Sequence, residues 1–223
     1  MPVISFISPK GGVGKTTSAV MLACQLARSS PVTIIDADPN EPVSAWAKRP
    51  GCPENITVVK GITQDNIEEE IDRAVERTPF VIVDCEGTAS VTVMDAIAAA
   101  NLVIIPTQGS QLDARQAGEA LKLIRKAERR GAKIPTRILF TRTSSVIRTK
   151  NLDAVQKQFR DAGVLMFDTH MHEREAFRAV FSIGGTLEAL DPKAVANGPK
   201  AIANARGLLG EVVAVLREEG QGA

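Results

Sequence analysis

Short runs of Val, Ile, Leu and Phe recur along the chain, and most are continuous rather than alternating with polar residues. These runs are found at Val3–Ser8, Val32–Asp36, Ile56–Val59, Phe80–Asp84, Leu102–Pro106, Arg137–Thr141 and Val164–Phe167. A continuous apolar run suits a strand that is buried on both faces of a parallel sheet. Since parallel strands need long crossover connections, helices are expected between the runs.

Amphipathic helical patterns separate the apolar runs, near Lys15–Arg28, Asp65–Arg77, Thr88–Ala99, Gln111–Arg130 and Asn151–Asp161. A further helix is expected from Pro199 onward, with one apolar face made by Ile202, Ala205, Leu209, Val212 and Leu216. The repeated strand–helix order predicts an α/β fold, a doubly wound and mainly parallel sheet flanked by helices. We expect residues 1–219 to form one domain and residues 220–223 a short polar tail.

Charge and cysteine content exclude several classes of protein. The chain of 223 residues has 27 basic and 26 acidic residues, a formal net charge of +1, so any contact with nucleic acid requires a local basic patch. Cys24, Cys52 and Cys85 are widely spaced, which speaks against a disulfide framework and favours the cytoplasm. No apolar run approaches the roughly 20 residues that span a bilayer, so we expect no membrane association.

A glycine-rich segment between the first strand and the first helix indicates phosphate binding. Gly14-Lys15-Thr16 matches the second half of the pattern G-x-x-x-x-G-K-[ST], although Pro9 stands where the first glycine belongs. The glycines allow backbone amides to turn toward phosphate oxygens, and the helix N-terminus adds positive potential. Lys15 is therefore predicted to contact the β- and γ-phosphates, and the Thr16 hydroxyl is predicted to bind Mg²⁺.

Three aspartates follow buried strands at positions suited to a magnesium site. Asp36 and Asp38 end the second strand, at the edge where open α/β sheets bind ligands. Their alternative role is to cap the turn that Pro39 introduces. Asp84 follows four apolar residues, the form of a Walker B strand, whose carboxylate holds Mg²⁺ beside the P-loop hydroxyl.

The segment Lys10–Thr17 resembles the deviant Walker A motif of the ParA/MinD family of ATPases. The resemblance implies a P-loop NTPase fold and a second, signature lysine at Lys10. In that family the signature lysine reaches the nucleotide of a partner chain, so that dimerisation depends on ATP. Charge chemistry alone leaves open whether Lys10 acts within its own chain or across a dimer.

The same resemblance implies a set of site residues and cofactors. The cofactors are ATP or ADP with Mg²⁺. Asp38 takes the family's switch I role in positioning the attacking water, and Asp36 supports the metal shell. The expected catalytic residues are Lys10, Lys15 and Asp38. The expected nucleotide-binding residues are Lys10, Gly11, Gly12, Val13, Gly14, Lys15, Thr16, Thr17 and Arg142. The expected metal ligands are Thr16, Asp36, Asp38 and Asp84.

Later segments extend the resemblance with weaker similarity. Cys85–Thr88 corresponds to switch II, and Gln111–Asp113 to a helix that contributes to the dimer interface. Phe140–Arg142 is similar to the segment that lines the adenine pocket, and Phe177–Leu187 to a late loop that closes over the base. Met171–Phe177 is similar to ParA-like proteins of the plasmid-transfer, or VirC, branch.

The implied function is an ATPase that forms ATP-dependent sandwich dimers and segregates or positions DNA or a protein cargo. Its hydrolysis is expected to be slow and to be stimulated by a ParB-type or adaptor protein. Non-specific DNA binding is expected on a surface rich in basic residues, which as a pattern also fits a solvated helix face. These basic residues are Lys122, Arg125, Lys126, Arg129, Arg130, Lys133, Arg142, Arg148, Lys150, Lys157 and Arg160.

Two alternatives share the loop and the fold. One is an ATP-dependent synthetase of the cobyrinic-acid or dethiobiotin type, although the chain shows no additional substrate domain. The other is a MinD-like membrane-associated switch, although the polar end of the chain differs from a basic amphipathic anchor. The expected location of the leading candidate is the cytoplasm, in contact with the nucleoid when ATP is bound.

Overall fold

A seven-stranded parallel sheet forms the centre of the molecule. The computed structural model describes residues 1–87, 90–129, 131 and 133–220. Its strands are β1 (Val3–Phe6), β2 (Val32–Ala37), β3 (Ile56–Val59), β4 (Phe80–Cys85), β5 (Leu102–Thr107), β6 (Thr136–Thr143) and β7 (Met171–His172). Their order across the sheet is β3-β2-β4-β1-β5-β6-β7, and every pair is parallel. The predicted doubly wound α/β fold is confirmed.

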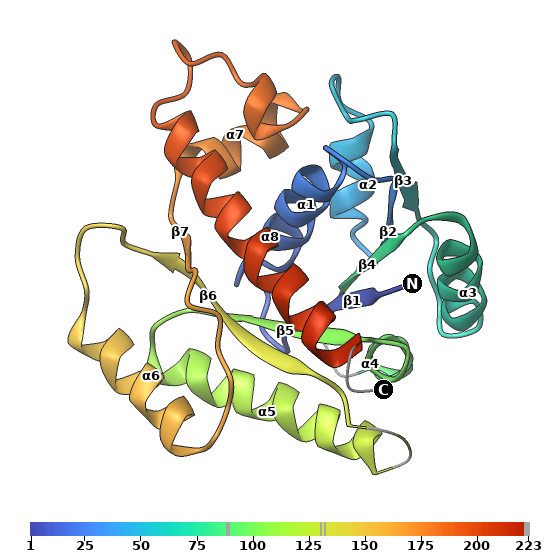
Figure 1. Cartoon of the computed structure of the whole chain (residues 1–223), viewed down its shortest axis with the longest axis vertical. Coiled ribbons are helices and arrows are strands. Elements are labelled where there is room, and N and C mark those ends of the chain that lie inside the picture. The colour runs from blue at the N-terminus through green and yellow to red at the C-terminus, as the bar shows by residue number, and fades with distance from the viewer. Residues whose placement is uncertain (88–89, 130, 132, 221–223) are drawn as a thin grey trace.

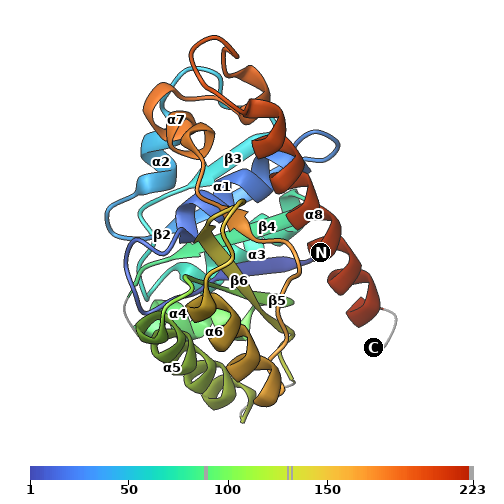
Figure 2. The same cartoon turned by 90° about the vertical axis from the view of Figure 1, so that its left-hand side faces the viewer.

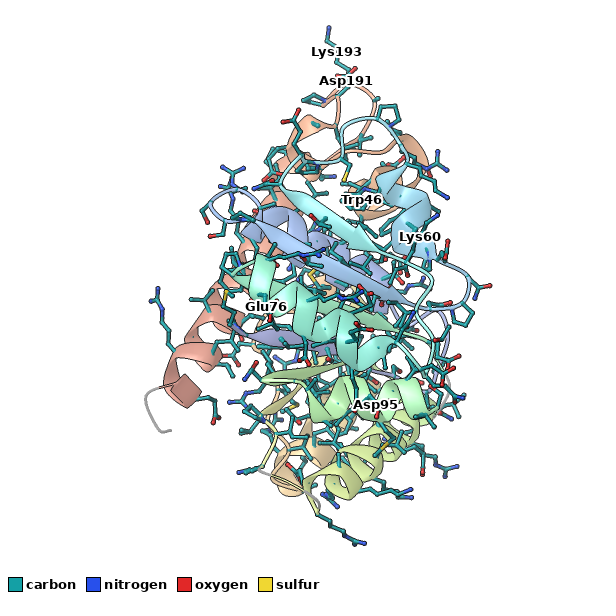
Figure 3. All side chains as sticks on the ribbon, turned by 90° about the vertical axis from the view of Figure 1, so that its right-hand side faces the viewer. Trp46, Lys60, Glu76, Asp95, Asp191 and Lys193 are labelled. Atoms are coloured by element: carbon teal, nitrogen blue, oxygen red, sulfur yellow. The ribbon has the colours of Figure 1, made fainter. Side chains whose placement is uncertain are left out.

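Helices cover both faces of the sheet (Figures 1 and 2). They are α1 (Lys15–Leu26), α2 (Pro42–Ala47), α3 (Ile67–Arg77), α4 (Val91–Ala98), α5 (Gln111–Glu128), α6 (Lys150–Asp161), α7 (Glu175–Ile183) and α8 (Gly198–Gly220). Apolar side chains of α1, α2, α7 and α8 pack into one core cluster, and those of α3, α4, α5 and α6 into another. Figure 3 shows α3 and α4 in front of the sheet, with Asp95 on α4.

The strand order brings the predicted chemistry to one edge of the sheet. Because all strands are parallel, the loops that follow β1, β2, β4, β5 and β6 leave from the same edge. Phe6, the last residue of β1, lies beside Asp84 in register, and Asp36 lies on the other side of Asp84. Side chains that are in register on neighbouring strands point to the same face. Asp36 and Asp84 therefore lie side by side, next to the end of β1 where the glycine-rich loop starts.

The backbone of the segment after α2 lies very close to the backbone at the end of α7. Trp46 is only 1% exposed, and its indole N–H donates to the Gly185 carbonyl at 3.0 Å. Gly184 has a φ of 105°. A Cβ atom at this position would lie 2.6 Å from the Pro50 carbonyl oxygen. Only glycine fits between these two chain segments.

Several expected elements differ from the observed ones. Val164–Phe167 is not a strand: Met166 makes one isolated bridge to Ile138, and the edge strand is instead β7. Much of Phe177–Leu187, expected as a loop, is the helix α7, because Ala176, Phe177 and Val180 form a buried helical face. The short helix α2 was missed. Thr88, the expected start of one helix, and Arg130, the expected end of another, lie outside the described residues. Residues 221–223 of the expected tail lie outside them as well.

Within the described residues, the helices are all too short or too polar to cross a bilayer.

Candidate nucleotide-binding site

The glycine-rich loop turns sharply between β1 and α1. Gly12 and Gly14 have positive φ values of 72° and 91°, which favour glycine strongly, so the loop can bring its amides to one side. Gly14 is the residue that precedes α1, and its carbonyl accepts the first helical hydrogen bond from Ser18 at 2.9 Å. An anion held in this loop would face the positive end of α1.

Neighbouring strands hold the glycine-rich loop in place. The Thr141 hydroxyl, at the end of β6, donates to the Val13 carbonyl at 2.6 Å, and the Thr107 carbonyl lies 3.2 Å from the same hydroxyl. The Gln108 side-chain amide donates to the Gly12 carbonyl at 3.4 Å. A Cβ atom at Gly87 would lie 3.4 Å from the Gly11 nitrogen, so the segment after β4 also borders the loop. Contacts with β5, β6 and the segment after β4 therefore support the shape of the loop.

Lys15 and Lys10 occupy different environments within this loop. Lys15 is 7% exposed, and its ammonium group donates to the Lys10 carbonyl at 3.4 Å, which leaves hydrogen-bonding capacity for an anion. Lys10 is 36% exposed, and its Nζ lies 2.6 Å from a carboxylate oxygen of Asp113, at the start of α5. The structure thus places Lys15 under the loop and Lys10 at its rim.

Asp84 is a buried carboxylate with its charge poorly compensated. It is fully buried, and among the described residues neither of its oxygens has a hydrogen bond of good geometry. Burial raises the pKa of Asp84 to about 7, despite the opposing effects of the Thr16 hydroxyl and the Lys15 ammonium. Oxygen ligands of this kind suit Mg²⁺, and a bound cation would favour the ionised form.

Asp36 and Asp38 differ in the oxygens that they leave free. One Asp36 oxygen accepts the Ser44 N–H at 2.7 Å, whereas the other has no partner among the described residues. Burial raises the pKa of Asp36, and the hydrogen bonds from Ser44 oppose that shift. Asp38 is half-buried, and one of its oxygens accepts from the Asn40 backbone and side chain, both at 2.9 Å. In this structure Asp38 therefore caps a turn, the alternative role noted above.

A pocket of about 340 Å³ opens next to the glycine-rich loop. Its walls include Gly14 and Thr17 at the loop, Arg142 after β6, and Phe177 and Phe181 on α7. Arg142 has a φ of 51°, an uncommon left-handed conformation for a residue with a side chain. A larger pocket of about 480 Å³ lies beside it, bordered by Arg148, Arg160 and His170. The smaller pocket is the one that adjoins the predicted phosphate site.

Asp113 is the main site residue that sequence reasoning did not single out. The notable local signal is Ser110-Gln111-Leu112-Asp113, in which the Ser110 hydroxyl caps α5 by accepting the Asp113 N–H at 3.2 Å. That signal predicts a helix start but not a partner 103 positions earlier in the chain. Thr141 and Gln108 were missed as supports of the loop for the same reason.

Comparisons with known proteins agree with this geometry. The family described as VirC1 protein matches residues 1–206. A protein named ParA from Rhizobium radiobacter is 38% identical over 207 residues, which cover 92% of this chain and 93% of the relative. Maintenance of carboxysome distribution protein A of Gloeobacter kilaueensis is 30% identical over 80% of this chain and 82% of its own. An ATP complex of a Cyanothece McdA variant has a TM-score of 0.76 at 17% identity, covering 98% and 96% of the two chains.

Proposed function

Because this chain belongs to the VirC1 family of ParA/MinD-type ATPases, we propose that it is an ATP-dependent dimerising switch that positions DNA or a protein cargo. The observation that carries the proposal is the presence of a glycine-rich loop, two lysines and a buried carboxylate without a hydrogen-bond partner at one edge of the sheet. The proposal includes the sandwich dimer, non-specific DNA binding and partner-stimulated hydrolysis.

The phosphates of ATP are proposed to bind at Gly11–Thr17. Backbone amides of the loop and the N-terminus of α1 supply the donors, and Lys15 supplies a positive charge below them. Lys15 is nearly buried, so its attraction to phosphate is less screened than that of a surface lysine. Positioning and charge neutralisation are the main contributions that a protein makes to phosphoryl transfer.

Magnesium is proposed to lie between Thr16 and Asp84, with Asp36 as a supporting ligand. The fit rests on the unpartnered oxygens of the two buried aspartates, which are neighbours in register. When bound, the ion neutralises charge on the phosphates. Asp38 keeps its proposed role in positioning water only if its side chain leaves the turn with Asn40.

The base of the nucleotide is proposed to enter the pocket of about 340 Å³ beside Gly14. Phe177 and Phe181 offer aromatic surface for stacking, and Arg142 can lie against a planar ring. The neighbouring ATP-bound McdA structure supports the choice of ATP. The pocket has room for a base, and it opens where the phosphate loop begins.

Dimerisation is proposed to occur across the edge of the sheet that holds the loop. Lys10 lies at the rim there. Val91 and Leu112, at the starts of α4 and α5, are 56% and 59% exposed at the same edge. Exposed apolar side chains around a polar site suit contact with a second copy. In the dimer, Lys10 of each chain is proposed to contact the phosphates bound by the other.

DNA binding is proposed for the exposed basic side chains of α5 and α6, which lie side by side (Figure 2). Ion pairs reduce this basic surface: Lys122 pairs with Glu119, Arg148 with Asp153, and Lys157 with Asp161. Some of the basic residues expected to bind DNA lie on or directly after these helices and have no such ion pair in the described chain. They are Arg125, Lys126, Arg129, Lys150 and Arg160. Phosphate contacts by these residues would make affinity fall steeply with salt.

The relatives support the proposed cargo and the proposed partner. One relative is named for the distribution of carboxysomes and another is named ParA, so positioning of a cargo is the shared theme. A ParB-type or adaptor protein is proposed to stimulate slow hydrolysis, because an added cation at the γ-phosphate raises such rates by about 10³–10⁵. The proposed location is the cytoplasm, with nucleoid contact in the ATP state.

One experiment tests the proposed function in steps. ATP binding, the mass of the protein in solution and binding of a labelled random duplex are measured with Mg²⁺ and either ATP or ADP. Dimers and tight DNA binding are expected with ATP only. Lys15→Ala should abolish nucleotide binding, whereas Lys10→Ala should retain binding and lose dimerisation. Lys193→Ala is the matched control, since Lys193 lies at the far tip of the molecule, before α8 (Figure 3).

Four outcomes would contradict parts of the proposal. Equal weak DNA binding with ATP and ADP would remove the DNA part. ATP-dependent dimers of Lys10→Ala would remove the assignment of Lys10 to the partner's nucleotide. ATP turnover that requires a small carboxylic acid would favour the synthetase alternative, and ATP-dependent binding to liposomes would favour the membrane switch.

A further inference from the structure

Lys10 and Asp113 form an ion pair that joins the phosphate loop to α5. The Lys10 Nζ lies 2.6 Å from one Asp113 oxygen, and the Ser110 hydroxyl donates to the other. The pair is formed between residues 103 positions apart, so it connects two separate elements of the fold. It is also the ion pair with the most buried carboxylate among those of the described residues, since Asp113 is 2% exposed.

Asp113 has little freedom to follow Lys10 elsewhere. Its backbone N–H donates a hydrogen bond to the Ser110 hydroxyl oxygen at the start of α5, and the same hydroxyl donates one to the Asp113 carboxylate. Hydrogen bonds from Lys10 and Ser110 outweigh burial and keep the pKa of Asp113 below its usual range, so the carboxylate is charged at neutral pH. A fixed, charged acceptor thus competes for the Lys10 ammonium.

The two positions of Lys10 exclude each other. A lysine ammonium that lies 2.6 Å from a buried carboxylate of its own chain cannot also reach a phosphate across a dimer interface. We propose that Asp113 is a positioning residue that holds Lys10 within its own chain until the nucleotide of a partner takes it. This inference rests on the proposed function, and it adds a step that resists dimerisation.

Breaking the Lys10–Asp113 ion pair costs free energy in each chain of the dimer. A buried carboxylate that loses its cation is penalised more than an exposed one, because water cannot replace the partner fully. Each dimer opens two pairs, so the effect on the dimer dissociation constant is the square of the effect per chain. A modest ion pair is expected to change an equilibrium constant about fivefold. Removal of the Asp113 charge from both chains should therefore lower the dimer dissociation constant about 25-fold.

The test compares Asp113→Asn with Asp161→Asn in the full chain. Asparagine keeps the shape of Asp113 and an oxygen for Ser110 while removing the charge. Asp161 forms an exposed pair with Lys157 at 2.9 Å, so the same substitution there is the matched control. Sedimentation with ATP and Mg²⁺ should show a dimer dissociation constant lowered about 25-fold in Asp113→Asn, and one unchanged in Asp161→Asn.

Either of two results would overturn the proposal. An unchanged dissociation constant in a folded Asp113→Asn protein means that Asp113 does not restrain Lys10. A weaker dimer means that the pair persists across the interface and supports dimerisation. Failure of the parent chain to bind ATP or to dimerise would instead contradict the proposed function, so the two failures are distinguishable.

A second measurement serves if Asp113→Asn does not fold well. Thermal unfolding of the nucleotide-free chain is measured for Lys10→Ala, Asp113→Ser, the double variant and the parent. If the ion pair is present in solution, the double variant should lose less Tm than the sum of the single losses. Additive losses would show that the pair does not form, and they would overturn the proposal without any nucleotide.

Discussion

His170 shows how one buried side chain can set a pH limit on the nucleotide-free protein. Its imidazole lies against the Phe140 ring, with centroids 5.2 Å apart, and the Gln156 amide lies 3.1 Å from its Nε2 atom. Burial lowers the pKa of His170, and the neighbouring His172 and Arg148 lower it further, while Glu211 and Asp168 oppose the shift. The folded protein therefore prefers the neutral imidazole.

The sign of the pH dependence follows from that depressed pKa. Above about pH 6.5 the histidine is neutral in both states, whereas at lower pH the unfolded chain takes up a proton first. The contribution of His170 to stability is therefore lost as the pH falls through about 6.5 toward the lower pKa of the folded state. Urea unfolding should show a smaller loss for His170→Asn than for the parent, and the full loss for Lys193→Ala. Equal losses in all three proteins would contradict this prediction.

Local motifs explain which site residues could be predicted from the sequence. Lys15, Thr16 and Asp84 lie in patterns whose strand and helix context is readable within about ten residues, and the structure brings them to one edge. Asp113 and Thr141 reach the loop only through the strand order, which fixes contacts across about 100 positions. Their roles were not readable from local patterns because topology, not spacing, creates them.

At the scale of elements, α8 fastens the segment that leads into β7. Asn204 accepts the His172 N–H at 3.1 Å and donates to the His170 carbonyl at 2.6 Å. Glu211, two turns later, accepts the N–H groups of Asp168 and Thr169, both at 2.7 Å. The helix thus supplies hydrogen bonds that a further strand would supply at a sheet edge.

Asn204→Ala should loosen this edge of the fold. It removes two hydrogen bonds to half-buried backbone groups, and an expected loss of about 1–3 kcal/mol follows. Urea unfolding measures the loss, and hydrogen exchange should show faster exchange at 168–172. Lys200→Ala, an exposed substitution on the same helix, should leave both unchanged. Slow exchange at 168–172 in Asn204→Ala would show that the helix is not what holds the segment.

The elements that the sequence analysis missed are short, and the segment that it wrongly predicted as a strand is partly exposed. β7 has two residues, too few for any periodicity, and α2 has six, beginning with a proline. Val164–Phe167 contains enough apolar residues for a strand, but Leu165 is 56% exposed and the segment touches β6 at one bridge only. Apolar content therefore identified the strands from β3 to β6 and failed at the β7 edge of the sheet.

At the scale of the whole molecule, we propose that the described residues unfold as one unit. Trp46, the only tryptophan, is buried on α2 within the cluster that also includes α1, α7 and α8 (Figure 3). Its fluorescence should change in the same urea range as far-UV circular dichroism, which reports all helices. Separate midpoints for the two signals would indicate two independently folding parts and would contradict a single domain of residues 1–219.

The glycine contact between the segment after α2 and the end of α7 ties two parts of the molecule together mechanically. At Gly184 and Gly185, backbone meets backbone with no side chain to trim or reshape. One of the two parts continues from the Asp36–Asp38 turn, and the other carries Phe177 and Phe181, which line the pocket proposed for the base. A side chain at Gly184 would push these two segments apart, so a shift on one side of that contact would be passed to the other.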